Sequence, residues 1–183
     1  MDPSTISRSD RKVDSAAFRS AMAGFASGVT VVTTIENSEP MGATVSAFTS
    51  LSMDPPMLLV CLNRTSETGQ AIERVGEFTV NILSEPQSDI AIRFASRSSS
   101  KFDDVVLSSN ATEHPVFAES LVAVRCEVAE TTYGGTHRIF LAHAVEVKLG
   151  SGEPLMYFQG GFGRFAPVVT EPAAATQIGP QDR

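Results

Sequence analysis

Short strand-like segments separated by turn residues run through this chain of 183 residues and constrain its fold more than any other feature. Apolar and β-branched residues fill segments 28–36, 41–52 and 57–63, with turn residues at 37–40 and 53–56 between them. The same pattern predicts later strands at 77–83, 121–133, 137–149 and 154–159. Six or seven strands with few helices predict a mainly β fold, an antiparallel barrel with peripheral helices.

Three helices are predicted beside these strands. The first is capped by Asp14 or Ser15, carries an i, i+3, i+4, i+7 apolar pattern and ends at Gly28. A second helix is predicted at 66–74, and a third opens at 84–86. The sequence contains no glycine-rich strand-to-helix turn of the dinucleotide-binding type, which disfavours a doubly wound nucleotide fold.

The chain is predicted to be one domain between two loose ends. Residues 1–13 are expected to form a flexible N-terminus, 14–165 the folded domain, and 166–183 a disordered tail rich in Pro, Ala and Thr. Residues 96–116 are predicted to form a long surface loop, and loops of that length are often functional.

Composition narrows the expected partners and compartment. The net charge of −7 argues against a general nucleic-acid or membrane-surface binder, because such proteins need a basic surface. Cys61 and Cys126 lie in apolar runs far apart in the sequence, so reduced, buried thiols are expected, and no metal-ligand spacing is present. The sequence shows neither a transmembrane run nor a signal-peptide core, which predicts a cytoplasmic protein.

Two segments are candidates for ligand binding on their chemistry. In 41–52, small hydroxyl residues lie between single apolar residues, so a flat ligand can approach the backbone closely. The alternative is an ordinary strand with a solvated hydroxyl face. At 63–66 a strand ends and a helix begins, and the helix N-terminus beside Arg64 is a candidate anion site. The alternative there is an ordinary helix cap next to a solvated arginine.

The order of several motifs resembles the short-chain NAD(P)H:flavin oxidoreductases, which are the reductase components of two-component flavin-dependent monooxygenases. The motifs lie at 18–33, 44–52, 54–60, 78–83, 94–95, 101–102, 135–137 and 157–162. The ordered set spans Phe18 to Arg164.

This resemblance implies a flavin reductase-like split barrel that uses FAD or FMN together with NADH or NADPH. It implies hydride transfer from nicotinamide C4 to flavin N5 and release of the reduced flavin to a partner monooxygenase. It also implies a homodimer with its sites near the subunit interface. Two alternatives stay open: a non-enzymatic flavin-binding carrier, and a split-barrel FMN oxidase that retains its flavin.

The resemblance also implies which residues bind flavin. The low-bulk strand is expected to contact the flavin ring through Thr44, Val45, Ser46, Ala47, Ser50, Leu51 and Ser52. The flavin phosphate is expected at Asn63, Arg64, Ser66 and Thr68, and further cofactor contacts at Phe94 and Lys101. Lys101 belongs to a small cluster with Arg97, Ser98 and Ser100 that is otherwise a solvated loop.

Two candidate residues come from the C-terminal half of the chain. His137 is expected to seat the nicotinamide, although Thr136 stands where the family has an acidic residue that can fix the imidazole. Phe162, on a glycine-rich turn, is expected to cover a flavin or nicotinamide face. The alternatives are a solvated strand end for His137 and simple packing of the C-terminal turn for Phe162. His143 is expected to serve packing or a dimer contact.

Overall fold

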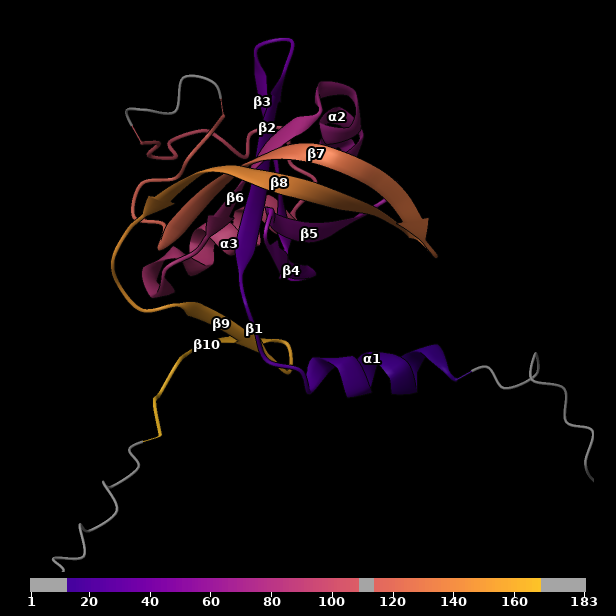
Figure 1. The fold of residues 1–183 in the computed structure, drawn as a ribbon. Coiled ribbons are helices and arrows are strands. Elements are labelled where there is room, and N and C mark those ends of the chain that lie inside the picture. The colour runs from indigo at the N-terminus through magenta and orange to yellow at the C-terminus, as the bar shows by residue number, and fades with distance from the viewer. Residues whose placement is uncertain (1–12, 109–113, 169–183) are drawn as a thin grey trace, which may run out of the picture.

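The computed structural model describes residues 13–108 and 114–168 and contains a strongly curved seven-stranded antiparallel sheet beside a small three-stranded one (Figure 1). The strands of the large sheet, in spatial order, are β3 (Glu39–Val45), β2 (Thr30–Glu36), β6 (Glu77–Ile82), β7 (Val122–Gly134), β8 (His137–Leu149), β5 (Pro56–Asn63) and β4 (Phe48–Met53). The small sheet has the order β1 (Ser27–Gly28), β9 (Leu155–Phe158) and β10 (Gly161–Arg164). The helices are α1 (Ser15–Ala23), α2 (Glu67–Val75), the short 3-10 helix η2 (Glu85–Gln87) and α3 (Ser88–Ala95). The predicted mainly β, antiparallel architecture is confirmed.

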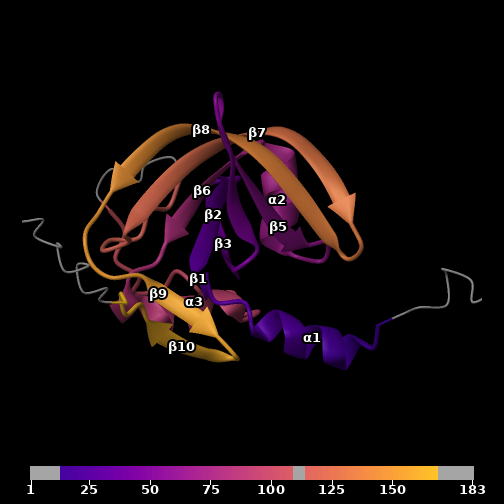
Figure 2. The same cartoon turned by 60° about the horizontal axis from the view of Figure 1, so that its bottom comes forward.

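The segment 41–52 is two strands, and the prediction of one strand was wrong. β3 and β4 are consecutive in the chain but lie at opposite edges of the seven-stranded sheet. Ser46 and Ala47 link them, and Cys61 of β5 donates its N–H to the Ala47 carbonyl at 2.9 Å. This short link holds the two edges of the sheet close together, so the sheet curls into a barrel, with β7 and β8 arching over the other strands in Figure 2.

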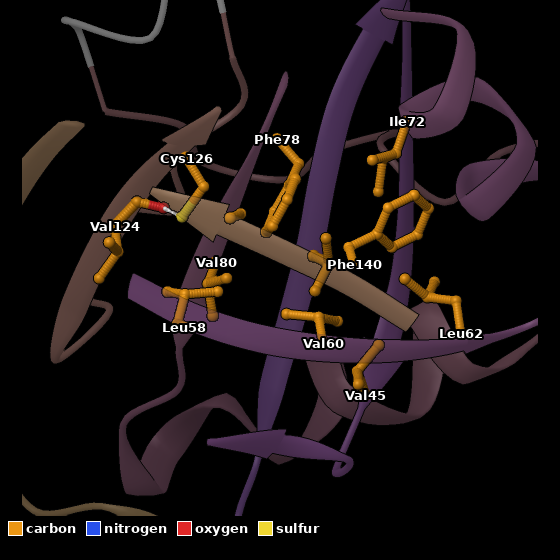
Figure 3. Packing of buried hydrophobic residues seen from close by; sticks show 12 residues of the cluster. Val45, Leu58, Val60, Leu62, Ile72, Phe78, Val80, Val124, Cys126 and Phe140 are labelled. Atoms are coloured by element: carbon orange, nitrogen blue, oxygen red, sulfur yellow. Dashed lines mark hydrogen bonds between the residues drawn. The ribbon is translucent and has the colours of Figure 1, made fainter. Parts of the chain in front are cut away.

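Two apolar clusters stabilise the barrel, one on each face of β2. Inside the barrel, Phe78 and Phe140 lie with ring centroids 6.2 Å apart and pack with Ile72 of α2 (Figure 3). Successive strand residues point to opposite faces, so Val32 belongs to this inner cluster while Val31 belongs to an outer cluster beneath α3. Each fully buried side chain of this kind contributes roughly 1.5–3 kcal/mol of transfer free energy.

The sequence predicted the starts of the first two helices correctly, but not the end of the first. Asp14 and Ser15 were the two predicted caps of α1. The structure has Asp14 as the cap, because its carboxylate accepts a hydrogen bond from the Ala17 N–H at 2.9 Å. The expected end at Gly28 was wrong, because the helix ends at Ala23 and Gly28 pairs with Met156 in the small sheet. Ser66 caps α2 as predicted.

The predictions for the irregular segments had mixed outcomes. Residues 114 and 115 are buried, so the prediction of a surface loop over 96–116 was wrong for that part. Strand β10 was not predicted; it forms a hairpin with β9. The flexible N-terminus expected at 1–13 and the disordered tail at 166–183 lie almost entirely outside the described residues. Among the described residues, no helix is long and apolar enough to cross a bilayer.

Candidate functional site

An open pocket of about 780 Å³ lies where three separate parts of the chain meet. Residues 40–44 of β3 form one side, Asn63 and residues 65–68 at the start of α2 form the second, and the end of α3 with the residues after it, 94–99 and 101–102, forms the third. The volume lies within the roughly 300–1,000 Å³ that ligand and cofactor sites in proteins have. Six of the predicted site residues line it: Thr44, Asn63, Ser66, Thr68, Phe94 and Lys101.

The start of α2 forms the polar side of the pocket. Ser66 accepts a hydrogen bond from the Gly69 N–H at 3.2 Å, and the Asn63 side-chain oxygen accepts from the N–H of Thr65 at 3.0 Å. The first turn of a helix leaves N–H groups without intrahelical partners and carries a partial positive charge. Glu67, in that turn, also lines the pocket and places a carboxylate there.

Lys101 supplies a half-buried cation across the pocket from α2. Its ammonium group donates hydrogen bonds to the carbonyls of Gly42, at 3.2 Å, and Phe94, at 3.4 Å. Burial lowers the pKa of Lys101 from its ordinary value, and the nearby carboxylate of Glu67 opposes that shift. The two carbonyls hold the charge in place, and because the group is partly removed from water its attraction for an anion is strengthened.

Aromatic rings form the apolar wall of the pocket. Phe94 is 1% exposed and meets the Phe102 ring edge to face, with centroids 4.8 Å apart. Gly42 makes this contact possible, since a Cβ at that position would lie 2.7 Å from the Phe94 ring. Thr44 lies on the same strand, and its hydroxyl donates to the Ala91 carbonyl of α3 at 2.6 Å. The Thr44 proton is therefore engaged within the protein, and its oxygen remains an acceptor.

The rest of the low-bulk segment lies apart from this pocket. None of the residues at 45–52, all of which are described, is among the lining residues. Val45 is buried in the inner cluster, and its carbonyl accepts a hydrogen bond from Thr30 at 2.7 Å. Ser46, Ala47, Ser50 and Leu51 are exposed, and Ser52 is partly buried. Their expected contact with a flavin ring stays a prediction.

Arg64 points toward β7 and does not line the described pocket. Its guanidinium lies over the Tyr133 ring, 5.0 Å from the centroid, where cation–π attraction holds it. The Tyr133 hydroxyl donates to the Glu73 carboxylate at 2.6 Å, and Arg138 pairs with the same carboxylate at 2.8 Å. Tyr133, followed by Arg138, lowers the pKa of Glu73.

His137 is not among the residues that line the pocket. It is exposed, and its Nδ1 lies 3.0 Å from the Thr136 hydroxyl, so Thr136 provides a partner where the family has an acid. His137 is directly opposite Asn63 in the β5–β8 pair, and directly opposed residues share one face of a sheet. The histidine therefore projects from the same face as a lining residue.

Phe162 lies in the small sheet and is not among the lining residues of the pocket. It pairs with Tyr157 across the β9–β10 hairpin, with ring centroids 5.5 Å apart, and is 40% exposed. Its expected role over a cofactor stays a prediction. The lining residues that the assignment from sequence missed include Gly42, Glu67 and Phe102. Phe102 had a signal, because it belongs to the Lys101-Phe102 motif.

A family model and several known proteins place this chain in the same protein family. Residues 22–166 match the family described as flavin reductase like domain. The reductase component of a 4-nitrophenol 4-monooxygenase/4-nitrocatechol 2-monooxygenase of Rhodococcus opacus is 46% identical over 155 residues, which cover 85% of this chain and 83% of that protein. The 4-hydroxyphenylacetate 3-monooxygenase reductase component of Thermus thermophilus is 37% identical over 149 residues, 81% of this chain and 95% of that protein.

A solved structure with the same fold is the NADH:FAD oxidoreductase SgcE6 of Streptomyces globisporus C-1027, in complex with NAD and FAD fragments. It has a TM-score of 0.80 and 31% sequence identity, over 86% of this chain and 96% of that chain. A homolog of nitrilotriacetate monooxygenase component B from Mycobacterium thermoresistibile also has a TM-score of 0.80, with 30% identity over 89% and 93% of the two chains. The chain therefore belongs to the flavin reductase-like domain family, and its curled sheet is the split barrel of that family.

Proposed function

We propose that this protein uses a reduced nicotinamide to reduce free FAD or FMN and releases the reduced flavin to a separate flavin-dependent monooxygenase. The observation that carries the proposal is the pocket of about 780 Å³, with its helix start, half-buried lysine and aromatic wall, in a chain of the flavin reductase family. Relatives named as reductase components of monooxygenases, and one named FMN reductase (NADH), support the same direction of electron flow.

The protein's own part in this reaction is binding, orientation and exclusion of water. When bound, the two cofactors supply the chemistry, a hydride donor at nicotinamide C4 and an acceptor at flavin N5. When the protein holds the two reactants in a productive geometry, it removes much of the activation barrier of such a step. A site of this kind needs no nucleophile and no metal ion.

The lining residues divide this work by their chemistry. The N-terminus of α2, with Ser66 and Thr68, and the ammonium group of Lys101 form a site for the flavin phosphate. The partly exposed Phe102 ring, backed by the buried Phe94 ring, presents an apolar surface that a flat heterocycle can contact. Glu67 places a negative charge at the same helix start, so the anion affinity is moderate, which suits a flavin that must leave after reduction.

His137 is proposed to seat the nicotinamide and to take no essential part in proton transfer. It projects from the face that carries Asn63, a residue that lines the pocket. His137→Ala is expected to raise the KM for the nicotinamide and slow turnover by an amount equal to about 1–2 kcal/mol, the loss of one hydrogen bond. Flavin affinity should change little. A variant that changes only flavin binding would place His137 on the flavin instead.

The test of the function is a steady-state assay of the purified protein. NADH and NADPH are crossed with FAD, FMN and riboflavin, and nicotinamide oxidation is followed at 340 nm. Oxidation that depends on added flavin is expected, with NADH favoured by analogy with the named relatives. Flavin binding without nicotinamide oxidation would indicate a carrier, and flavin retained through gel filtration would indicate an oxidase. Absence of flavin-dependent oxidation with both nicotinamides would overturn the proposal.

The working form of the protein is proposed to be a homodimer. None of the nine residues of α1, all described, is buried, although Phe18, Met22 and the following Phe25 are large and apolar. An isolated helix of that length is not stable in water, so the helix requires a covering surface. Two exposed apolar residues of β8, Val147 and Leu149, could cover α1 of a second copy of the chain. Light scattering at micromolar concentration should give about twice the chain mass of 19.5 kDa.

A cytoplasmic location is also proposed. Cys61 and Cys126 are both free thiols in the described structure, as expected in a reducing compartment. Reduced nicotinamides are maintained in that compartment. Quantitative labelling of two thiols after denaturation of protein isolated under non-reducing conditions would support the proposal, because Cys126 is fully buried in the fold, and a disulfide would contradict it.

A further inference from the structure

The segment that carries Lys101 and Phe102 has little regular secondary structure, so something outside it must fix its position. Its described parts, 96–108 and 114–121, contain one isolated β-bridge, between Leu107 and Phe117. Around that bridge, Ser108 donates to the Val116 carbonyl at 2.7 Å and Ala118 to the Val106 carbonyl at 3.0 Å. These bonds join the two halves of the segment to each other, but they do not attach the segment to the barrel.

Two buried polar side chains of the barrel contribute to that connection, together with Gln87, which donates to the Ala118 carbonyl at 2.7 Å, and Glu77, whose carboxylate lies 3.0 Å from His114. Thr33 of β2 donates its hydroxyl to the Pro115 carbonyl at 2.6 Å. Asn81 of β6 donates its amide to the same carbonyl at 3.3 Å and accepts from the Phe117 N–H at 3.1 Å. Asn81 also donates to Thr33 at 3.2 Å, so the two side chains form one network.

This network is fully enclosed, and the Asn81 amide also lies 3.2 Å from the Val31 carbonyl, so its two N–H groups serve three acceptors. Thr33 and Asn81 are both 0% exposed. A buried amide or hydroxyl that loses its partner keeps the full cost of desolvation, so the segment has a strong preference for the position that satisfies both groups. Pro115 has no N–H of its own to offer, and its carbonyl is held by both side chains.

The position of Phe117 is transmitted directly to the pocket. The Phe117 ring is 2% exposed and packs against Phe94, with centroids 5.0 Å apart, and against Phe102, with centroids 6.4 Å apart. Phe94 and Phe102 line the pocket, whereas Phe117 does not. Lys101 precedes Phe102 and donates to the Phe94 carbonyl, so the position of its ammonium group depends on the positions of Phe94 and Phe102.

We propose that Thr33 and Asn81 are positioning residues for flavin binding: a buried anchor on the barrel that sets the Phe94–Phe102 wall and Lys101 through Phe117. The proposal rests on the proposed function, because it assigns the flavin to this pocket. Gly42 lies directly opposite Thr33 in the β2–β3 pair, so the anchor and the close approach of the Phe94 ring occupy one face of the sheet. Neither anchor residue lines the pocket itself.

The chain offers a matched control for this anchor in the adjacent residue. Thr34 is also 0% exposed and also donates its hydroxyl to a backbone carbonyl, that of Glu77, at 2.8 Å. Glu77 begins strand β6, so the Thr34 bond stays within the sheet, while the Thr33 bond reaches the pocket segment. Thr33→Val and Thr34→Val therefore both remove a fully buried hydroxyl that donates to a backbone carbonyl, and they differ in what the hydroxyl holds; Thr33→Val also removes an acceptor of the Asn81 amide.

The experiment titrates FAD and FMN against each purified variant by flavin fluorescence and records urea unfolding of the same samples. Both Val variants should lose stability, Thr33→Val the more of the two because it also removes an acceptor of the buried Asn81 amide. Thr33→Val should raise the flavin Kd about fivefold, the effect of one hydrogen bond, and Thr34→Val should leave it within twofold of wild type. Thr33→Ser, which keeps the hydroxyl, should restore wild-type affinity. Equal flavin affinity of the two Val variants overturns the proposal.

The route through Phe117 is tested by a double-mutant cycle. Phe117→Leu alone should raise the flavin Kd, and Thr33→Val should add little in that background, since both act on one path. If the losses of flavin-binding free energy from the two substitutions add in full, the route through Phe117 is overturned. If Thr33→Val is too unstable to purify, Phe117→Leu alone decides, and an unchanged Kd overturns the proposal. Wild-type protein that binds neither flavin would overturn the proposed function itself, and the anchor with it.

Discussion

Gly42→Ala is the sharpest single test of how the pocket wall is built. A Cβ at residue 42 would lie 2.7 and 2.8 Å from two carbons of the Phe94 ring and 3.3 Å from the tip of Phe102. Phe94 is 1% exposed and packed on its far side by Phe117, so its ring has little space into which it can move. Overpacking of this kind costs about 1–3 kcal/mol, which corresponds to roughly 2–12 °C in Tm for a domain of this size.

The change should also reduce flavin affinity, because the ring that must move lines the pocket. The matched control is Gly28→Ala in β1, where an added Cβ meets nothing within 4 Å among the described residues. That variant should be neutral or more stable by about 0.4–1 kcal/mol, through reduced entropy of the unfolded chain. Thermal unfolding and flavin titration of both variants measure the difference. A Gly42→Ala protein as stable and as tight for flavin as Gly28→Ala would refute the described packing of Phe94.

Three further outcomes are expected. Lys101→Met should weaken binding of FMN and make the remaining affinity less dependent on salt, because one phosphate-facing charge is removed; an unchanged salt dependence would place the phosphate elsewhere. Phe140→Ala, at 0% exposure in the inner cluster, should cost about 3–5 kcal/mol in urea unfolding, and a loss below about 1 kcal/mol would contradict its place in the core. Arg125, and after it His114, lowers the pKa of Glu77 below 4.5, so its stabilising effect is present above that pH and is lost as the pH falls through the lowered value. The stability difference between wild type and Glu77→Gln should therefore shrink below pH 4.5, and a difference independent of pH would contradict the pairing.

The candidate site was predictable from the sequence where a local signal coincides with a lining position. Ser66 was read as a helix cap and Lys101 as part of a family motif, and both line the pocket. Arg64 shows the limit of that reasoning. Its place beside a helix start predicted a charge directed at an anion, but its guanidinium stacks on Tyr133, a residue far away in the sequence. Side-chain direction at a helix corner depends on which partners the fold brings near, and no local pattern contains that information.

The sequence by itself determined most of the strand content, two candidate caps for the first helix, the cap of the second and the ordered motifs of the family. These depend on residues close together in the chain: alternation along strands, a hydroxyl or carboxylate three residues before an N–H, and turn residues between apolar runs. Only the tertiary structure decided that residues 41–52 divide into two strands at opposite edges of one sheet. It also decided that residues from 40–44, 63–68 and 94–102 line one pocket. Pairing between distant strands and burial of Thr33 and Asn81 beneath Pro115 are long-range events, and their free energy belongs to the assembled core.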